Sequence, residues 1–249
     1  MRLDVYLVDS RMVSTRSKAS DLIKRKLCLI NGNVATKPGM EVNGSENIEI
    51  IEKFSYVSRA GEKLKDAVAS FGIDFKDVLV IDVGSSTGGF TDCSLQEGAK
   101  FVYAYDVGDN QFDSNLKKDS RIELHENTNI LDVVLPKSDM VLIDVSFTSV
   151  IPIISHFMSH DSEYIVLIKP QYEAGKTFFK GGILKDKKLH VEIVLKVLDF
   201  IKTLGFYPYN FKPSILKGKT GNQEYLLYFG TKKKDISVNN DEIKGMIKC

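Results

Sequence analysis

The sequence predicts a protein of the α/β class, with a mostly parallel sheet that helices cover on both faces and a small α+β domain in front of it. Two observations lead to this prediction. From residue 58 onwards, short and almost uninterrupted apolar runs alternate with stretches of helical periodicity, which is typical of buried parallel strands and the helices that connect them. The residues before that point lack this alternation and carry an excess of basic side chains.

Length and composition are those of a globular protein. The chain has 249 residues, of which 43% are hydrophobic and 27% are charged, and its formal net charge is +1. This length accommodates a small domain and a medium-sized one, and the composition excludes a fibrous or disordered chain. Cys28, Cys93 and Cys249 form no C-x-x-C pair, so we expect no disulfide framework and no metal site. So few cysteines fit a reducing cytoplasm.

No stretch of the sequence suits a membrane span. The longest run without charged side chains, residues 145–160, is shorter than the ~20 apolar residues of a membrane helix and contains several polar residues. We therefore interpret it as a buried or half-buried helix. The residues that follow Met1 are of mixed polarity, so no signal peptide is expected.

The N-terminal segment combines positive charge with a helix and a hairpin. Residues 1–40 contain eight basic and three acidic side chains. A helix capped by Ser17 or Ser20 is expected to end in a run of basic residues, and an Asn-Gly pair at residues 31–32 then predicts a β-hairpin. A basic helix followed by a tight hairpin suits a phosphate backbone, although charge alone also fits a solvated face.

Three parts of this segment resemble the small S-four RNA-binding domain of ribosomal proteins and RNA-modifying enzymes. They are Arg2-Leu3-Asp4, Ser14-Thr15-Arg16-Ser17-Lys18-Ala19 and Ile30-Asn31-Gly32-Asn33-Val34. The resemblance implies an RNA-binding domain over residues 1–52. Its expected RNA contacts are the basic side chains of Arg2, Arg11, Arg16, Lys18, Lys24, Arg25 and Lys26.

The second domain is expected over residues 58–230, after a linker at residues 53–57. Apolar residues at helical spacing predict a helix from Ala60 to Phe71 that ends at Gly72. Five apolar runs then predict strands at residues 78–83, 101–105, 121–124, 140–143 and 164–168.

The C-terminal part is expected to close the sheet. A helix is predicted near residues 189–204, and residues 205–213 and 223–229 are predicted to form an antiparallel pair of strands. The tail, residues 231–249, is charged and rich in Lys and Asn, so we expect it to fray.

A glycine-rich loop follows the first strand of the second domain and opens a helix. Residues 82–90, Asp-Val-Gly-Ser-Ser-Thr-Gly-Gly-Phe, have the spacing G-x-x-x-G-G, which is neither the dinucleotide G-x-G-x-x-G nor a P-loop. Asp106 ends the next strand, where a carboxylate can accept both hydroxyls of a ribose. Together these features predict an adenosine-containing cofactor, and the alternative is a set of purely structural glycines.

The loop resembles the S-adenosylmethionine loop of class I methyltransferases, which have a Rossmann-like fold, and more narrowly that of the FtsJ type. The resemblance implies that the loop lies against the methionine part of the cofactor, that Asp106 holds the ribose, and that two asparagines frame the adenine. The expected cofactor contacts are Asp82, Gly84, Ser85, Gly88, Gly89, Phe90, Asp106, Val107, Asn127, Asn129 and Asp144.

Four further residues suggest chemistry on a ribose. Asp144 and Lys169 end the fourth and fifth predicted strands, and ligands bind at that edge of an open α/β sheet. Lys63 and Glu224 lie in two other polar segments. A neutral lysine amine can take the proton of a 2′-hydroxyl that attacks a methyl sulfonium, if burial or a nearby cation lowers the pKa of the amine from about 10.4. A lysine at a strand end can instead be a solvated rim residue.

Five segments, in this order, resemble the TlyA family. They are residues 58–64, 82–90, 143–147, 169–175 and 221–224. The resemblance implies S-adenosylmethionine-dependent 2′-O-methylation of cytidine in ribosomal RNA. The implied catalytic tetrad is Lys63, Asp144, Lys169 and Glu224, with Lys169 as the general base. Arg59 is an expected RNA contact, and the chain departs from the family's pattern at Asn127 and Leu131, where arginines are expected.

Three other functions compete with methyl transfer. The family's name carries a haemolysin history, so a haemolysin or cytolysin is one alternative, but no secretion signal supports it. A catalytically silent RNA-binding or ribosome-assembly factor is the second. A pseudouridine synthase, which also uses this front domain, is disfavoured because a methyl-donor loop occupies the second domain. We therefore expect a cytoplasmic enzyme whose partners are ribosomal RNA or ribosomal subunits.

Overall fold

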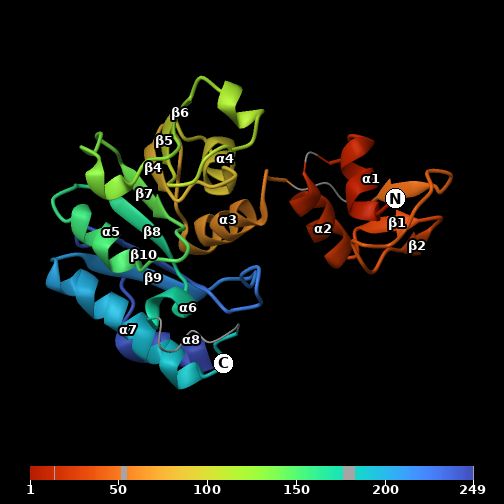
Figure 1. Cartoon of the computed structure of the whole chain (residues 1–249). Helices are drawn as coiled ribbons and strands as arrows, with labels where there is room; N and C mark the ends of the chain where they lie inside the picture. Colours follow the sequence, from red (N-terminus) through yellow and green to blue (C-terminus); the bar gives the residue numbers. More distant parts are fainter. Residues whose placement is uncertain (14, 52–54, 176–182, 249) are drawn as a thin grey trace. The chain divides into compact units, whose positions relative to one another are not determined.

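The computed structural model describes residues 1–13, 15–51, 55–175 and 183–248. The chain divides into two compact units, Met1–Ser55 and Tyr56–Cys249 (Figure 1). The division falls inside the predicted linker, of which residues 53 and 54 lie outside the described residues. The two units are described separately below.

The N-terminal unit contains two helices and a three-stranded antiparallel sheet. Its elements are α1 (Leu3–Asp9), α2 (Arg16–Lys24), β1 (Cys28–Ile30), β2 (Asn33–Val34) and β3 (Ile48–Ile50), and the strand order is β2-β1-β3. The predicted hairpin is confirmed, and its turn residues Asn31 and Gly32 have φ of 50° and 77°. Leu3 and Leu7 of α1 pack with Ala19 and Ile23 of α2 in the core of this unit.

The start of α2 differs from the prediction. The N-cap is Thr15, whose Oγ1 accepts a hydrogen bond from the backbone N–H of Lys18 at 3.2 Å, and the helix begins at Arg16. Ser17 and Ser20 therefore lie inside the helix and do not cap it. The first helical turn carries no buried apolar residue until Ala19, so hydrophobic periodicity marks the start of this helix too late.

The C-terminal unit is a seven-stranded sheet with helices on both faces, so the predicted α/β class is confirmed. Its helices are α3 (Arg59–Phe71), α4 (Gly89–Gln96), α5 (Val150–His156), α6 (Pro170–Glu173), α7 (Lys187–Thr203) and α8 (Asn240–Lys248), with 3-10 turns η1 (Leu116–Lys118) and η2 (Ile130–Asp132). Its strands are β4 (Leu79–Val83), β5 (Phe101–Tyr105), β6 (Ile122–His125), β7 (Met140–Ile143), β8 (Glu163–Ile168), β9 (Tyr207–Pro213) and β10 (Tyr225–Gly230).

The sheet is parallel except at one end. The strand order is β6-β5-β4-β7-β8-β10-β9, and the first five strands in this order are parallel to one another. β10 is antiparallel to both of its neighbours, β8 and β9, as predicted for the closing pair. Because β10 runs against β8, its first residue, Tyr225, pairs with the last residue of β8, Ile168.

Alternate residues of the strands enter two separate cores. Ile81, Val83 and Val141 face α5, α7 and α8, whereas Val80 and Leu142 face α3 and α4. This pattern follows from the two-residue period of a strand, and it explains why the strands are apolar on both faces. The loops at the carboxyl ends of the parallel strands remain free to carry polar groups.

Two C-terminal expectations need correction. The tail was predicted to fray, but residues Asn240–Lys248 form α8, whose Ile243 and Ile247 are buried in the core beside α7. Two isoleucines at helical spacing are enough to dock a short helix even in a polar segment. Within residues 145–160, the helix is only the seven-residue α5. In the described part of the chain, no helix is long and apolar enough to cross a membrane.

Candidate active site

The carboxyl edge of the parallel strands brings the predicted site residues together. β5 and β6 lie on one side of β4, and β7 and β8 lie on its other side. Ligands of open α/β sheets bind in the crevice outside such a switch in strand order. The glycine loop follows β4 and Asp144 follows β7, so both lie at this crevice.

The glycine loop is packed tightly against its own chain. Gly84 and Gly88 have φ of 83° and 88°, a left-handed conformation that suits glycine. A Cβ on Gly84 would lie 2.7 Å from the backbone oxygen of Asp144, and one on Gly89 would lie 2.2 Å from Ser58 Oγ. These glycines are therefore already required by packing within the protein. The contact of the loop with a methionine moiety remains a prediction.

Two buried side-chain oxygens beside the loop have no hydrogen-bond partner among the described residues. They are Asp82 Oδ1 and Ser85 Oγ, and Asp82 Oδ2 accepts from Thr91 Oγ1 at 2.6 Å. Burial raises the pKa of Asp82 to about 7, against the hydrogen bond from Thr91, and the charges of Asp144 and Asp106 also raise it. Buried polar atoms normally have partners, so these two atoms suit a ligand with polar groups.

Asp106 follows β5 and is held by backbone donors. Its Oδ2 accepts from the N–H of Ser86 at 2.8 Å, and its Oδ1 accepts from the N–H of Gly108 at 2.6 Å. Each carboxylate oxygen has a second lone pair, so the group can still accept ribose hydroxyls. The neighbouring Val107 is 73% exposed. An oriented acid beside an exposed apolar residue fits a nucleoside.

The remaining predicted cofactor residues have mixed surroundings. Asn127 has a φ of 54°, and its N–H donates to the oxygen of Gly108 at 2.9 Å. Asn129 caps η2, because its Oδ1 accepts from the N–H of Leu131 at 3.2 Å. Both asparagines lie on the segment that follows β6, at the carboxyl end of that strand. Phe90, in contrast, is 2% exposed and packs in the core with residues of α3 and α4.

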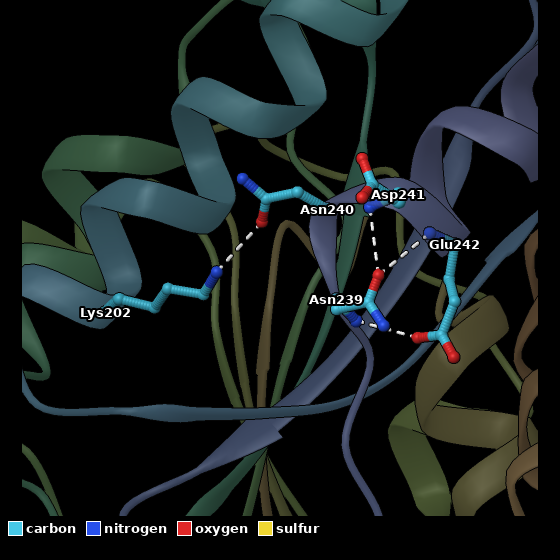
Figure 2. Close-up of a pocket in the computed structure, with 5 residues that line it drawn as sticks. All are labelled: Lys202, Asn239, Asn240, Asp241 and Glu242. Carbon is cyan, nitrogen blue, oxygen red and sulfur yellow. Dashed lines mark hydrogen bonds between the residues drawn. The ribbon is translucent and has the colours of Figure 1, made fainter.

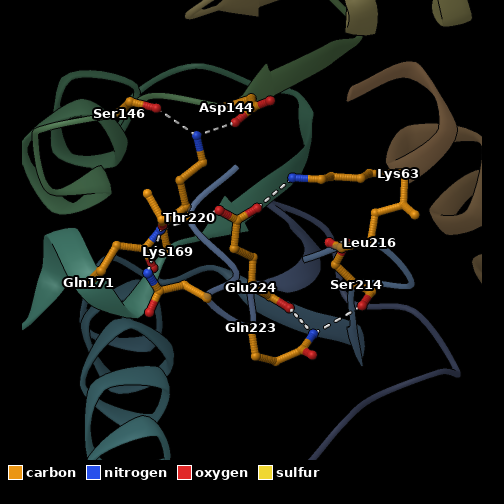
Figure 3. Close-up of polar contacts among 11 residues, drawn as sticks. Lys63, Asp144, Ser146, Lys169, Gln171, Ser214, Leu216, Thr220, Gln223 and Glu224 are labelled. Carbon is orange, nitrogen blue, oxygen red and sulfur yellow. Dashed lines mark hydrogen bonds and ion pairs between the residues drawn. The ribbon is translucent and has the colours of Figure 1, made fainter. Parts of the chain in front are cut away.

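Lys169 pairs with Asp144 across the ends of β8 and β7. Lys169 Nζ lies 2.6 Å from Asp144 Oδ1 and donates a hydrogen bond to Ser146 Oγ at 2.9 Å (Figure 3). Only 10% of the Lys169 side chain and 14% of the Asp144 side chain are exposed. Pro170 begins α6, so the strand ends abruptly and the amine is held at the edge of the sheet.

The pKa of Lys169 is raised in this arrangement. Burial lowers the pKa of Lys169, but the charge and hydrogen bond of Asp144 and the charge of Glu224 raise it, and the raising effects prevail. The general-base prediction requires burial or a nearby cation to lower this pKa, and burial alone does not do so here. Two carboxylates cluster with this lysine, and they stabilise its ammonium form.

A second pair, Lys63 and Glu224, lies in the same cluster (Figure 3). Lys63 Nζ donates to Glu224 Oε2 at 2.5 Å, with 9% and 3% of the two side chains exposed. The other carboxylate oxygen, Oε1, accepts from Gln171 Nε2 at 3.3 Å. A Cβ on Gly218 would lie 2.4 Å from Oε1, so the backbone of the β9–β10 loop packs directly on Glu224. All four predicted tetrad residues thus come together from α3, β7, β8 and β10.

In addition to the Lys169–Asp144 pair, hydrogen bonds of Glu173 join the segment after β8 to the segment after β7. Glu173 accepts hydrogen bonds from Ser149 Oγ at 2.6 Å and from the N–H of Val150 at 2.8 Å. Between these anchors, Phe147 is 87% exposed, has a φ of 67°, and contacts the ring of Tyr172 with centroids 5.2 Å apart. A strained, exposed aromatic residue held this firmly beside a cluster of charges is characteristic of a functional loop.

In the N-terminal unit, a buried acid orients two of the predicted RNA-binding arginines. Asp4 is 4% exposed, and it accepts hydrogen bonds from Arg2 at 2.9 and 3.1 Å and from Arg16 at 3.0 Å. The hydrogen bond from Arg2 lowers the pKa of Asp4 to about 2, against burial and with help from Arg16. The side chains of Arg2 and Arg16 keep 50% and 60% exposure while they share this carboxylate.

The other predicted RNA contacts differ in exposure. Arg11, Lys24 and Lys26 are exposed, whereas Lys18, Arg25 and Arg59 are half-buried. Arg59 belongs to the C-terminal unit, where it is the first residue of α3.

A surface recess elsewhere does not resemble a ligand site. It is lined by Lys202 and residues 239–242, at the N-terminus of α8 (Figure 2). Asn239 Oδ1 accepts from the N–H groups of residues 241 and 242, and Lys202 donates to Asn240 Oδ1 at 3.0 Å. These groups form a helix cap, in which their hydrogen bonds are made to one another.

Comparison with known proteins agrees with this architecture. The FtsJ-like methyltransferase family matches residues 56–231, and the S4 domain matches residues 1–48. The chain is 34% identical over 240 residues to a 16S/23S rRNA (cytidine-2′-O)-methyltransferase TlyA of Mycobacterium tuberculosis, with 92% of this chain and 90% of the relative covered. The chain belongs to the TlyA family. It is an FtsJ-like methyltransferase with an N-terminal S4 domain.

Other relatives of this chain carry haemolysin names. Hemolysin A of Brachyspira hyodysenteriae is 39% identical over 240 residues, with 92% of this chain and 99% of the relative covered. A solved structure from Streptococcus thermophilus, also hemolysin-named, is 32% identical with a TM-score of 0.76, covering 100% of this chain and 94% of that chain. The two-domain fold is therefore shared along the full length.

Three residues of the cluster were not assigned a role from the sequence. Ser146, Gln171 and Gly218 contact Lys169 or Glu224. The first two lie two residues after Asp144 and Lys169, where a chain leaving a strand can return its side chain to the same edge. Nothing in the local sequence marks Gly218, because its role depends on the antiparallel pairing of β10.

Proposed function

We propose that this chain transfers a methyl group from S-adenosylmethionine to the 2′-hydroxyl of a cytidine in ribosomal RNA, with Lys63, Asp144, Lys169 and Glu224 as the catalytic tetrad. The observation that carries the proposal is the buried cluster of two lysine–carboxylate pairs beside the glycine loop. The activity printed for the M. tuberculosis relative supports the substrate. The partners are then ribosomal subunits, and the place of action is the cytoplasm.

The residues of the crevice fit S-adenosylmethionine. The unpaired atoms Asp82 Oδ1 and Ser85 Oγ suit the polar methionine end, and Asp106 suits the ribose. Asn127 and Asn129, with the exposed Val107, are the residues for the adenine. When bound, this cofactor supplies an electrophilic methyl group and a positive charge near the tetrad.

Lys169 acts as the general base in this proposal. The carboxylates of Asp144 and Glu224 raise the pKa of its amine and so favour the ammonium form. A positive charge nearby lowers this pKa and so favours the neutral amine. Asp144 and Ser146 fix the direction of the amine, which takes the proton of the 2′-hydroxyl as the oxygen attacks. Glu224, held by Lys63, orients the hydroxyl.

The test is methyl transfer from labelled S-adenosylmethionine to purified ribosomal subunits by wild type, Lys169→Ala and the exposed control Lys118→Ala. We expect Lys169→Ala to lose about 10²- to 10⁴-fold in rate, the range of general acid–base catalysis, while calorimetry shows unchanged cofactor affinity. Normal transfer by Lys169→Ala would refute the base assignment.

Two further outcomes address the alternatives. If wild type binds ribosomal RNA but incorporates no methyl group into either subunit, the chain is a binding or assembly factor. If purified wild type and Lys169→Ala lyse erythrocytes equally and neither methylates RNA, the haemolysin interpretation replaces the proposal.

A further inference from the structure

The C-terminal unit has to attract RNA without a general excess of positive charge. Residues 56–249 contain 25 basic and 26 acidic side chains. Within the tetrad, two lysines face two carboxylates, so the cluster is also close to neutral. Any attraction of this unit for a polyanion comes from local groups of cations that are not paired with acidic side chains.

The β9–β10 loop, residues 214–222, packs against the site. Gly218 packs on Glu224, as described above, and its N–H donates to the oxygen of Asn222 at 2.9 Å. The N–H of Gly221 donates to the oxygen of Gly218, also at 2.9 Å. Because β10 starts where β8 ends, this loop lies at the same sheet edge as Lys169. The positions of its side chains are thus tied to the catalytic cluster.

Three exposed lysines lie on this loop and on a second segment that is anchored to it. Lys217 and Lys219 flank Gly218. Lys185 comes from the segment before α7, which is anchored to the loop because the N–H of Leu184 donates to the Oδ1 of the fully buried Asn222 at 2.8 Å. In the described parts of the chain, none of the three lysines forms an ion pair with an acidic side chain.

We infer that Lys185, Lys217 and Lys219, the lysine rim, bind RNA phosphates next to the nucleotide that enters the site. This inference rests on the proposed function, and it names the part of the C-terminal unit that holds the substrate backbone. Lysine ammonium groups on flexible stems act as point charges toward phosphate and do not read base edges. The lysine rim therefore increases the affinity for RNA but does not contribute to its sequence specificity.

The rim is predicted to raise affinity for RNA and not the rate of chemistry. The test variant is Lys185→Gln/Lys217→Gln/Lys219→Gln. The matched control is Lys100→Gln/Lys137→Gln/Lys233→Gln, which removes the same charge from exposed lysines at the opposite edge of the sheet, before β5, before β7 and after β10. Both variants are assayed for methyl transfer to ribosomal subunits and for binding to protein-free ribosomal RNA between 0.05 and about 0.3 M salt.

We expect the rim variant to need roughly 10- to 50-fold more RNA for half-saturation at about 0.15 M salt, from a salt slope of about 0.7 per lost phosphate contact. Its rate at saturating RNA and its S-adenosylmethionine affinity should stay within about twofold of wild type. Its plot of log affinity against log salt should be shallower by about 2, whereas the control should match wild type.

Three outcomes overturn the inference. The first is a rim variant that, like the control, loses no affinity for RNA. The second is a loss of RNA affinity that is equal in the rim variant and the control. The third is a loss on ribosomal subunits but not on protein-free RNA, which would assign the rim to a ribosomal protein. Failure of the proposed function looks different, since wild type itself would then transfer no methyl group to RNA.

Discussion

Replacing one member of the Lys63–Glu224 pair should destabilise the C-terminal unit far more than replacing both. The perturbations are Lys63→Met, Glu224→Gln and the double variant. Lys63→Met keeps most of the apolar stem but leaves Glu224, among the described residues, with only the weak donor Gln171, at 3.3 Å. Glu224→Gln leaves the Lys63 ammonium, of which 9% of the side chain is exposed, without a counter-charge.

The magnitude follows from burial. Both side chains are almost fully withdrawn from water, so solvent screens the pair little. Breaking a buried pair by removing one partner costs about 3 to 5 kcal/mol, whereas replacing both partners with neutral groups is often close to neutral. We expect about 3 to 5 kcal/mol for each single variant and less than about 2 kcal/mol for the double variant, which gives a coupling energy of about 4 kcal/mol or more.

The measurement is urea unfolding followed by far-UV circular dichroism, because the chain contains no tryptophan to report fluorescence. Each single loss is a large fraction of the roughly 5 to 15 kcal/mol that stabilises a typical domain. All three variants should be inactive in methyl transfer, so stability and activity separate in the double variant. Additive losses, with the double variant the least stable of the three, would refute the account of the pair as mutually dependent charges.

Two further predictions concern the N-terminal unit and the β9–β10 loop. The pKa of Asp4 is lowered from 3.8 to about 2, so its contribution to stability is present above pH 3.8 and disappears as the pH falls through 2. Asp4→Asn should therefore lower the free energy of unfolding of the N-terminal unit by about 1 to 2 kcal/mol at neutral pH and have no effect near pH 2, which acid titration by circular dichroism will check. Gly218→Ala should reduce methyl transfer at least about tenfold, because a Cβ 2.4 Å from Glu224 Oε1 must displace that carboxylate, a misplacement that costs orders of magnitude in rate. Gly245→Ala, where an added Cβ meets nothing within 4 Å, is the control, and equal activity of the two variants would contradict this reading.

Much of the fold could be predicted from the sequence because the strands are buried on both faces. Their apolar runs stand out from the polar loops, and the strands at residues 101–105 and 140–143 match the structure residue for residue. Strand ends then place Asp144 and Lys169 at one edge, since parallel strands share a direction. Lys63 and Glu224 could be predicted only from the resemblance to a family. Nothing in the local sequence indicates that α3 and the start of β10 lie beside Asp144 and Lys169.

What sequence patterns missed depends on contacts between distant segments. The glycines of residues 84–89 were predicted to make room for a cofactor, but in the structure they also make room for the backbone of Asp144 and for Ser58. The charge state of Lys169 likewise depends on how closely Asp144 and Glu224 approach it. Apolar periodicity could not show the docking of α8, because only Ile243 and Ile247 carry it.

The reversed direction of β10 has a consequence for how the protein is made. One strand both covers the open edge of β8 and places Glu224 beside Lys63, and it is the last strand of the sheet to be synthesised. A nascent chain that has completed every earlier strand still has an exposed sheet edge and an unpaired Lys63. A protein truncated ahead of this strand would therefore lack both the cover of β8 and the proposed catalytic residue Glu224.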